Sequence, residues 1–328
     1  MKLGLLPGLG GSLADLGGQA ERVVEYDFKA YAKAFDATYF SYGDCPQREW
    51  FYMGAVPIVS APRLHRYLYQ VAMVPRLRGQ DVLRVLNFTG SLPGILAKRL
   101  YGCKLVVGYN YHAAEIARIH GKPGHALWLR ALLKLVARYA DGVIVPSAAL
   151  QREVADAGYR GMFGLIPNGV DVERFRPRET PPAWPGSVLS VGRRSREKNL
   201  EVLEQTRGLN LWHVEGRPYA EMPLIYQEAG VFVLPSLTEG CSKALLEAMA
   251  TGLPCITTMA AAEGLAGGWD PLVIMENGSD AAQWASAIRH ARKHPELGAA
   301  ARAYVEKHHD IRRTLYQEIA FLNWVARS

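Results

Sequence analysis

The sequence predicts an α/β protein made of two Rossmann-like domains that face each other across a cleft. Short apolar runs rich in β-branched residues alternate with segments of helical periodicity, which is typical of parallel sheets covered by helices on both faces. The same alternation starts again after a proline-dense stretch in the middle of the 328-residue chain, so a second sheet is expected there. Because ligands of open α/β sheets lie beyond the carboxyl ends of the strands, we expect a cleft between the two sheets.

The first set of strands lies before that stretch. Residues 2–6, 81–87, 104–108 and 141–145 are short apolar runs bounded by Gly, Asp or Pro, as buried strands usually are. Residues 129–139 carry apolar side chains three and four positions apart, so they predict one of the covering helices.

The second set has five short apolar runs, at residues 187–191, 211–214, 231–234, 255–258 and 272–275. The two sets are separated by Pro167-Asn168-Gly169 and by residues 174–185, whose prolines prevent regular structure and predict a linker. We therefore place one domain at residues 1–168 and the other at residues 169–309.

The chain is expected to be helical from about residue 281. Its last segment, residues 310–328, should cross back and pack on the first domain, because it contains a helix with one apolar face. That face is formed by Leu315, Ile319, Leu322 and Val325.

Composition excludes several classes of protein. No run of 18 apolar residues occurs, so no transmembrane helix is expected. Residues 1–7 lack the charged region and cleavage site of a signal peptide, so we interpret them as the first strand of a cytoplasmic protein. The four cysteines form no CxxC pair and have no His partner at ligand spacing, so no structural metal is expected. Disulfides are not expected in a cytosolic protein. The net charge of +7 favours anionic ligands, although an ordinary basic enzyme would look the same.

The strongest functional signal is PSLTEGCSKALLEAMATGLP at residues 235–254. A buried strand ends there, a polar loop with Gly240 follows, and a helix begins near Ser242. Free backbone N–H groups at a helix start bind anions. Glu239 precedes this anion site and Glu247 lies on the second turn, so the carboxylates could bind hydroxyls on either side of a phosphate, as a sugar nucleotide requires.

This stretch resembles the donor-site signature of the family 4 retaining glycosyltransferases, E-x7-E followed by A-M-A-x-G-x-P; these enzymes have the GT-B fold. A capped helix with two incidental glutamates is the alternative. The resemblance implies a nucleoside-diphosphate sugar as co-substrate, no other cofactor and no metal. It also implies that the first domain binds the acceptor and the second binds the donor. The donor-binding residues that it assigns here are Gly240, Cys241, Ser242, Lys243 and Glu247.

A second motif, VGRRSREKN at residues 191–199, follows a strand and opens a helix. It resembles the family's G-R-x-x-x-E-K-[GN] segment, in which the Arg and the Lys hold the donor diphosphate. The corresponding residues are Arg193 and Lys198. Cations at these positions would neutralise the charge that develops on a leaving diphosphate. Taken alone, the segment could also be a solvated basic loop.

Three further resemblances are less specific. LIPNGVDVERF at residues 165–175 is similar to the family's interdomain segment, where Asn168 or Asp171 would tie down loop backbone. Gly17 and Gly18 resemble the family's glycine-rich loop after the first strand and are assigned to donor binding, although a flexible turn is an alternative. His112 stands where the family often has a histidine that contacts the donor sugar; the alternative is a loop histidine.

One segment is shorter than in the family, and another has a composition that bears on membrane binding. Residues 200–230 are shorter than their family counterpart, so the nucleotide base is not assigned. Residues 62–80 are basic and aromatic, which fits docking on an anionic membrane surface beside a lipid-linked acceptor, and equally fits a solvated surface helix. No base-reading motif is present, so nucleic acid is not expected as a partner.

Together these features predict a retaining, metal-independent glycosyltransferase of the hexosyltransferase type, acting on a glycan or lipid-linked acceptor. It would be cytoplasmic, or peripheral at the inner face of a membrane. Arg193 and Lys198 would stabilise the departing diphosphate, Glu239 would orient sugar hydroxyls, Glu247 would bind the ribose and His112 would contact the sugar. The alternatives are a sugar-nucleotide epimerase of the same fold and a non-catalytic partner subunit that binds a nucleotide sugar.

Overall fold

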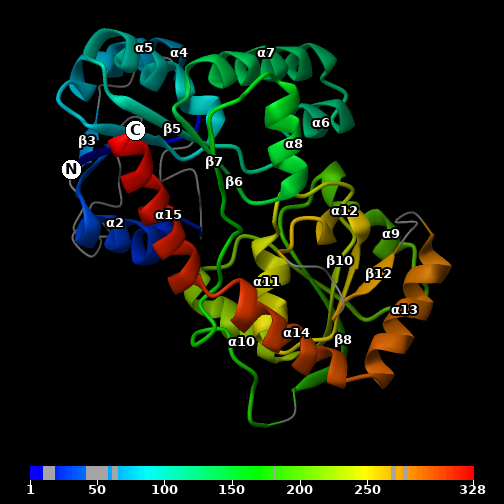
Figure 1. Ribbon diagram of the computed structural model, residues 1–328. Helices are drawn as coiled ribbons and strands as arrows, with labels where there is room; N and C mark the ends of the chain where they lie inside the picture. Colours follow the sequence, from blue (N-terminus) through cyan, green and yellow to red (C-terminus); the bar gives the residue numbers. More distant parts are fainter. Residues whose placement is uncertain (10–18, 42–57, 61–65, 181, 267–270, 276–279) are drawn as a thin grey trace.

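The computed structural model describes residues 1–9, 19–41, 58–60, 66–180, 182–266, 271–275 and 280–328 (Figure 1). The described residues form two separate parallel sheets with helices on both faces, as the sequence predicts. None of the helices in these ranges is both long enough and apolar enough to cross a bilayer.

The first sheet has, within the described ranges, seven parallel strands in the order β3-β2-β1-β4-β5-β6-β7. Their bounds are β1 (Lys2–Leu6), β2 (Asp36–Ser41), β3 (Ile58–Ser60), β4 (Val82–Val85), β5 (Lys104–Gly108), β6 (Gly142–Val145) and β7 (Met162–Leu165). The four predicted strands are β1, β4, β5 and β6, and all four are buried at the centre of the sheet. The strands nearer the two edges were not predicted, because they are short, polar or half exposed and give no continuous apolar run.

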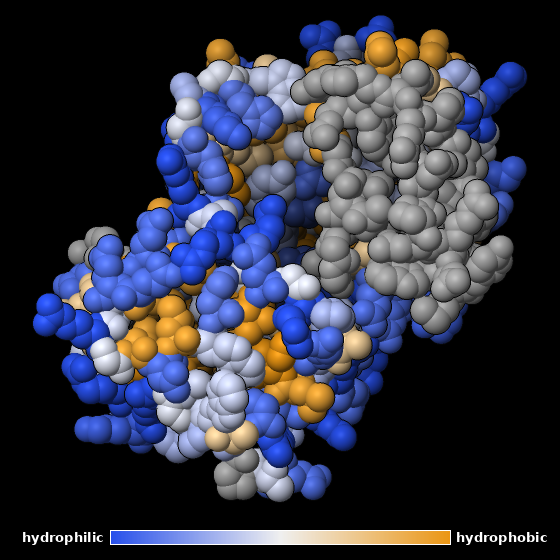
Figure 2. Space-filling view, turned by 180° about the vertical axis from the view of Figure 1, so that it is seen from behind, coloured by the Kyte–Doolittle hydropathy of each residue, from blue (hydrophilic) through white to orange (hydrophobic). Residues whose placement is uncertain are grey.

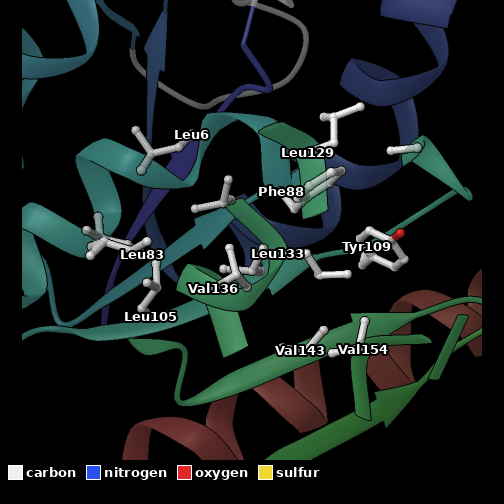
Figure 3. Close-up of a cluster of buried hydrophobic side chains, with 14 of the residues drawn as sticks. Leu6, Leu83, Phe88, Leu105, Tyr109, Leu129, Leu133, Val136, Val143 and Val154 are labelled. Atoms are coloured by element: carbon white, nitrogen blue, oxygen red, sulfur yellow. The ribbon is translucent and has the colours of Figure 1, made fainter. Parts of the chain in front are cut away.

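Helices cover both faces of this sheet. Their bounds are α1 (Gln19–Arg22), η2 (Val23–Phe28), α2 (Lys29–Ala34), α4 (Arg66–Met73), η3 (Val74–Leu77), η4 (Phe88–Gly90), α5 (Ser91–Tyr101), α6 (Ala113–Ile119), α7 (Pro123–Tyr139) and α8 (Ala148–Asp156). Helix α7 contains the predicted helix 129–139. Its Leu129, Leu133 and Val136 belong to the same buried cluster as Leu105 and Val143 of the strands (Figure 3), so the apolar stripe of this helix forms much of one core.

The second sheet contains five parallel strands among the described residues, in the order β12-β11-β10-β8-β9. They are β8 (Trp184–Val191), β9 (Leu211–Val214), β10 (Ala229–Leu234), β11 (Cys255–Thr258) and β12 (Val273–Met275), which correspond to the five predicted runs. Strand β8 begins inside the predicted linker. The helical elements are η5 (Arg196–Lys198), α9 (Glu201–Glu204), η6 (Tyr219–Glu221), α10 (Met222–Gln227), α11 (Lys243–Ala250), α12 (Met259–Ala262), α13 (Ala281–Lys293) and α14 (Glu296–His308).

Helix α15 (Ile311–Arg327) leaves the second domain and packs on the first (Figure 1). Its Phe321, Leu322 and Val325 join a core cluster with Leu3 and Ile144 of the first sheet. Of the predicted apolar face, Leu322 and Val325 are buried, while Leu315 and Ile319 are half-buried. The chain crosses between the domains beside residue 170, where Val170 N donates to the His309 carbonyl (2.8 Å) and Ile311 N donates to the Val170 carbonyl (3.0 Å).

A buried ion pair fastens α15 to the first sheet. Glu318 Oε1 accepts from Arg84 Nε (2.7 Å) and from the Tyr31 hydroxyl (2.6 Å), and only 6% of the Arg84 side chain and 12% of the Glu318 side chain are exposed. The pKa of Arg84 is raised: burial alone would lower it, and the Glu318 carboxylate outweighs burial. Removal of either partner would leave the other charge buried and unpaired.

We expect Glu318→Ala to lower the free energy of unfolding by about 3–5 kcal/mol, because a buried guanidinium would lose its counter-charge. Equilibrium unfolding in urea measures this loss. Glu221→Ala removes the partner of an exposed i,i+4 ion pair with Arg217 and should change stability by about 0.5 kcal/mol or less. A loss below about 1 kcal/mol in Glu318→Ala would show that the pair does not fasten the helix.

Candidate active site between the two sheets

A cavity of about 530 Å³ lies where the carboxyl ends of the first sheet's strands meet the second domain. Seen from behind, the surface is hollowed between the two halves of the molecule (Figure 2). We call this space the interdomain cavity. It is lined by the residues that follow β1, β4, β5 and β6, and by Arg193 and Lys243 from the second domain.

Two predicted site residues are in contact: Lys198, in the turn after β8, and Glu239, in the loop after β10. Lys198 Nζ forms an ion pair with Glu239 Oε1, and the Ser236 hydroxyl donates to the same oxygen (2.8 Å). The Lys198 side chain is 23% exposed and that of Glu239 is 13% exposed, so the pair is only partly screened by water. Leu237 N donates to the Glu197 carbonyl (2.8 Å), which ties the loop after β8 to the loop after β10. The two motifs therefore form one constellation.

Arg193 lies at the start of the same constellation. Its side chain is exposed and lines the interdomain cavity. No carboxylate of the described residues forms an ion pair with it, which leaves the guanidinium available to an anion. Gly192 before it has φ +139°, a conformation that side-chain-bearing residues rarely adopt, so the turn that aims Arg193 depends on a glycine.

Helix α11 begins as predicted, directly after the Glu239 loop. Ser242 caps it, with its hydroxyl accepting from Leu245 N (3.4 Å), and Asn168 Nδ2 donates to the Cys241 carbonyl (2.6 Å). Gly240 lies against the first domain: a Cβ there would be 1.8 Å from the Asn110 carbonyl oxygen. The loop after β5 and the loop after β10 are thus in direct contact through a position without a side chain.

Glu247 and Lys243 both lie on α11, but Glu247 is buried inside the second domain and Lys243 faces the interdomain cavity. Glu247 is buried and accepts from the Tyr226 hydroxyl (2.9 Å); burial raises its pKa to about 7. It is absent from the described lining of the interdomain cavity, so its contact with a ribose stays a prediction. Lys243 does line the cavity, where burial and the nearby Arg22 lower its pKa to about 8. Burial also raises the pKa of the Cys241 thiol to about 12, which keeps it protonated and a poor nucleophile.

His112 immediately precedes α6, in the loop after β5. Its Nδ1 lies 2.7 Å from Glu153 Oε2, and the Tyr109 hydroxyl donates to Glu153 Oε1 (2.7 Å). The hydrogen bond to Glu153 raises the pKa of His112 despite the burial of the ring. Burial would raise the pKa of Glu153, but its bonds from His112 and Tyr109 lower it. The structure thus places His112 two residues after the Asn110 carbonyl that touches Gly240, and fixes its ring with a carboxylate that the sequence analysis missed.

The pKa shifts of His112 and Glu153 define the pH range in which this pair stabilises the fold. The folded pKa of His112 lies above its usual 6.5, so its contribution to stability is complete below about pH 6.5 and is lost as the pH rises through the folded value. The folded pKa of Glu153 lies below its usual 4.5, so its contribution is lost only as the pH falls through that lower value. We expect Glu153→Gln to destabilise the protein more at about pH 5.5 than at about pH 8.5 in urea unfolding. An equal loss at both values would contradict the charged pair.

Other contacts between the domains carry no signal in the sequence. His120 Nε2 lies 2.6 Å from Glu197 Oε2, and the Tyr26 hydroxyl donates to Asp171 Oδ2 (2.7 Å). Arg174 pairs with Glu25 (2.7 Å). The partners are far apart in the chain, so only the folded arrangement brings them together. The predicted function of Asp171 in the loop is present: its Oδ1 accepts from the backbone N of Glu173 and of Arg174 (2.9 and 3.0 Å).

Some predicted positions cannot be compared with the structure. Gly17 and Gly18 lie outside the described residues, as does part of the predicted membrane segment 62–80. Within the described ranges, no group of three or more His, Cys, Asp or Glu side chains could hold a metal ion.

Comparisons with known proteins agree with the geometry. The family model "Glycosyltransferase Family 4" matches residues 18–174, and the model "Glycosyl transferases group 1" matches residues 178–294. Sulfoquinovosyl transferase SQD2 of Arabidopsis thaliana is 29% identical over 167 residues, which cover 39% of this chain and 32% of that protein. D-inositol 3-phosphate glycosyltransferase of Corynebacterium urealyticum is 32% identical over 140 residues, with the same coverages. The chain thus spans about a third of the length of the curated relatives it matches.

Solved structures resemble the whole chain. The Anabaena protein HepE in complex with UDP and glucose has a TM-score of 0.79 at 16% identity, covering 98% of this chain and 99% of that one. Sucrose-phosphate synthase from Thermosynechococcus elongatus has a TM-score of 0.81 at 17% identity and full coverage of both chains. At these identities the likeness shows the fold.

Proposed function

Since the chain belongs to the GT-B glycosyltransferases of family 4 type, we propose that it transfers a sugar from a nucleoside diphosphate to an acceptor hydroxyl with retention of configuration. The observation that carries this proposal is the Lys198–Glu239 pair, with Lys198 and Arg193 lining the same small hollow. Arg193 and Lys198, the two cations for a diphosphate, follow β8, and Glu239, the carboxylate for sugar hydroxyls, follows the neighbouring strand β10. HepE forms complexes with UDP and glucose and with UDP-glucose, which supports a nucleotide-sugar donor here.

Each residue of this constellation has a chemical task in the proposal. Arg193 and Lys198 stabilise the negative charge that grows on the diphosphate as the glycosidic bond breaks. The first turn of α11 offers free N–H groups to the same phosphates. Glu239 orients sugar hydroxyls, and His112 contacts the sugar from the other domain. Two cations and a helix terminus can fill the place of a metal ion.

The proposed reaction is a substitution on one face of the sugar. The bond between the anomeric carbon and the phosphate oxygen breaks, and a bond to the acceptor oxygen forms on the same face. The acceptor proton passes to the departing diphosphate. Glu239 is held by Lys198 and by the Ser236 hydroxyl, which suits a carboxylate that binds hydroxyls better than one that attacks carbon.

A ligand screen tests the proposal. Nucleoside diphosphates and their sugars are compared by thermal shift, where a ligand at 100 times its Kd adds about 2.7 kcal/mol of stability. The stabilising nucleotide sugar is then incubated with the protein, and the products are identified. Free nucleoside diphosphate is expected. An isomeric sugar nucleotide would identify an epimerase, and binding without turnover would identify a non-catalytic subunit.

A surface of the first domain supports a peripheral, cytoplasmic-side location at an anionic membrane. Helices α4, α5 and α7 lie side by side along one edge of the molecule (Figure 1), and these helices and η3 contain no Asp or Glu. We give the name docking face to a set of exposed basic and apolar residues on these helices, together with Arg78 just after η3. It consists of Leu68, Val71, Arg76, Arg78, Arg99, Leu100, Tyr101, Leu127, Arg130, Lys134 and Arg138. Basic and apolar side chains mixed in this way fit a bilayer with negative headgroups, from which a lipid-linked acceptor would be taken.

Vesicle binding tests this face. Each basic residue near an anionic surface contributes about 1 kcal/mol, so Arg130→Gln with Lys134→Gln should weaken binding to phosphatidylglycerol vesicles about thirtyfold in sedimentation. The control is Arg289→Gln with Lys293→Gln, which removes two exposed charges from α13 in the second domain. Equal losses in the two double variants, or no preference for anionic vesicles, would reject the docking face.

A further inference from the structure

A second cavity adjoins the interdomain cavity. It also has a volume of about 530 Å³ and shares Leu9, Thr89, Tyr111 and Arg193 with the first. We call it the side cavity. Helices α6 and α7 form one wall, and Arg194, Ser195 and Glu215 of the second domain form the other. Of the residues proposed to bind the donor, only Arg193 lines it, so the side cavity begins where the leaving diphosphate would lie and extends away from the rest of the donor site.

The side cavity is open to solvent. Several of its lining residues, including Lys122, His125 and Trp128, are exposed to solvent. The domains are in contact where Gly240 lies against the Asn110 carbonyl and where Tyr26 bonds to Asp171, and at the side cavity itself His120 lies 2.6 Å from Glu197. A molecule that must reach the donor from solvent has an entrance beside α7.

An aromatic surface stands at this entrance. The rings of His125 and Trp128 lie nearly parallel, 13° apart, with centroids separated by 5.5 Å, and 39% of Trp128 is exposed. A flat aromatic surface of this kind attracts the C–H groups on one face of a sugar ring, because the ring face is electron-rich and both surfaces are apolar. The wall opposite is polar. There Glu215 is anchored by a hydrogen bond from Arg194 N to its Oε2 (3.1 Å).

We propose that the side cavity is the acceptor site and that the acceptor presents a pyranose ring to Trp128. This inference rests on the proposed function and extends it, since it assigns the acceptor to a class of compound, the glycosides. The ring stacks on Trp128 at the entrance, its hydroxyls bond to polar groups such as Thr89 and Glu215, and the reacting hydroxyl points toward Arg193, beside the donor.

Soluble methyl glycosides of glucose, galactose and mannose are suitable probes, because they need no membrane. The variants are Trp128→Ala, Trp128→Phe and, as a control, Trp324→Ala, which removes an exposed tryptophan on α15. Three quantities are measured: release of nucleoside diphosphate without acceptor, transfer to the glycosides, and glycoside binding by saturation-transfer NMR. In Trp128→Ala we expect transfer and binding to fall about tenfold. Release without acceptor should stay unchanged, and Trp128→Phe should restore most of the transfer.

The other outcomes separate the two proposals. Wild-type transfer in Trp128→Ala, an equal loss in Trp324→Ala, or no binding of any methyl glycoside to the wild-type protein would overturn the acceptor site. If no nucleotide sugar is turned over under any condition, the proposed function fails, while glycoside binding by NMR still decides whether Trp128 forms a sugar site.

Discussion

Lys198→Ala is expected to reduce turnover by about a hundredfold to a thousandfold, the range found when one donor to a developing negative charge is removed. The ammonium of Lys198 would meet the diphosphate as its charge grows, and it also holds Glu239. Release of nucleoside diphosphate at saturating donor measures the effect. Circular dichroism should show an intact fold, because the pair is partly exposed and Ser236 still bonds to Glu239.

The matched control is Arg196→Ala, which removes an exposed cation from the same short helical turn. It should keep turnover within about twofold, as surface substitutions usually do. Glu239→Ala and Arg193→Ala should each lower turnover severely as well. Near-normal turnover in Lys198→Ala would reject the assignment of the diphosphate to this loop.

Gly240→Ala should strongly lower turnover. The new Cβ would lie 1.8 Å from the Asn110 carbonyl oxygen, so the loops after β5 and β10 would have to separate. Those loops carry His112 and Glu239, and a displacement of about 1 Å is enough to lower turnover about a hundredfold. We expect that loss in kcat/KM for the donor, with the second domain still folded.

Gly186→Ala provides the comparison, because a Cβ at Gly186 meets nothing within 4 Å and the residue lies in the same domain. Its kcat/KM should equal that of the wild-type protein. If Gly240→Ala is equally active, the contact between the two loops is dispensable, and the proposed assembly of one site from two domains would have to be abandoned.

The sequence predicted the elements that are buried on both sides. Strands such as β5 and β10 are continuous apolar runs, because a parallel strand under two layers of helices must be apolar throughout. Strand β2 begins with an exposed Asp36 and β7 ends with an exposed Leu165, so their patterns resemble loops. A strand near the edge of a sheet needs only part of its surface to be apolar.

The candidate site could also be predicted in part, where its residues stand in short local motifs. Lys198 and Glu239 stand in short local motifs, so they were found without knowledge of the fold. The contact of His120 with Glu197 and that of His112 with Glu153 depend on how distant segments pack, and neither histidine carries a local pattern that names its partner. Trp128 looked like any residue of an amphipathic helix until the opposite wall of its cavity was known.

The return of α15 to the first domain has a consequence for the order in which the protein is made. During synthesis the ribosome completes residues 1–309 before it reaches this helix, and until then Leu3 and Ile144 lack the cover of Phe321 and Leu322. The N-terminal half therefore cannot finish folding first, although domains usually fold in the order of their synthesis. The apolar surface around Leu3 and Ile144 stays uncovered until α15 has been synthesised. An apolar surface of this kind is one that chaperones of nascent chains bind.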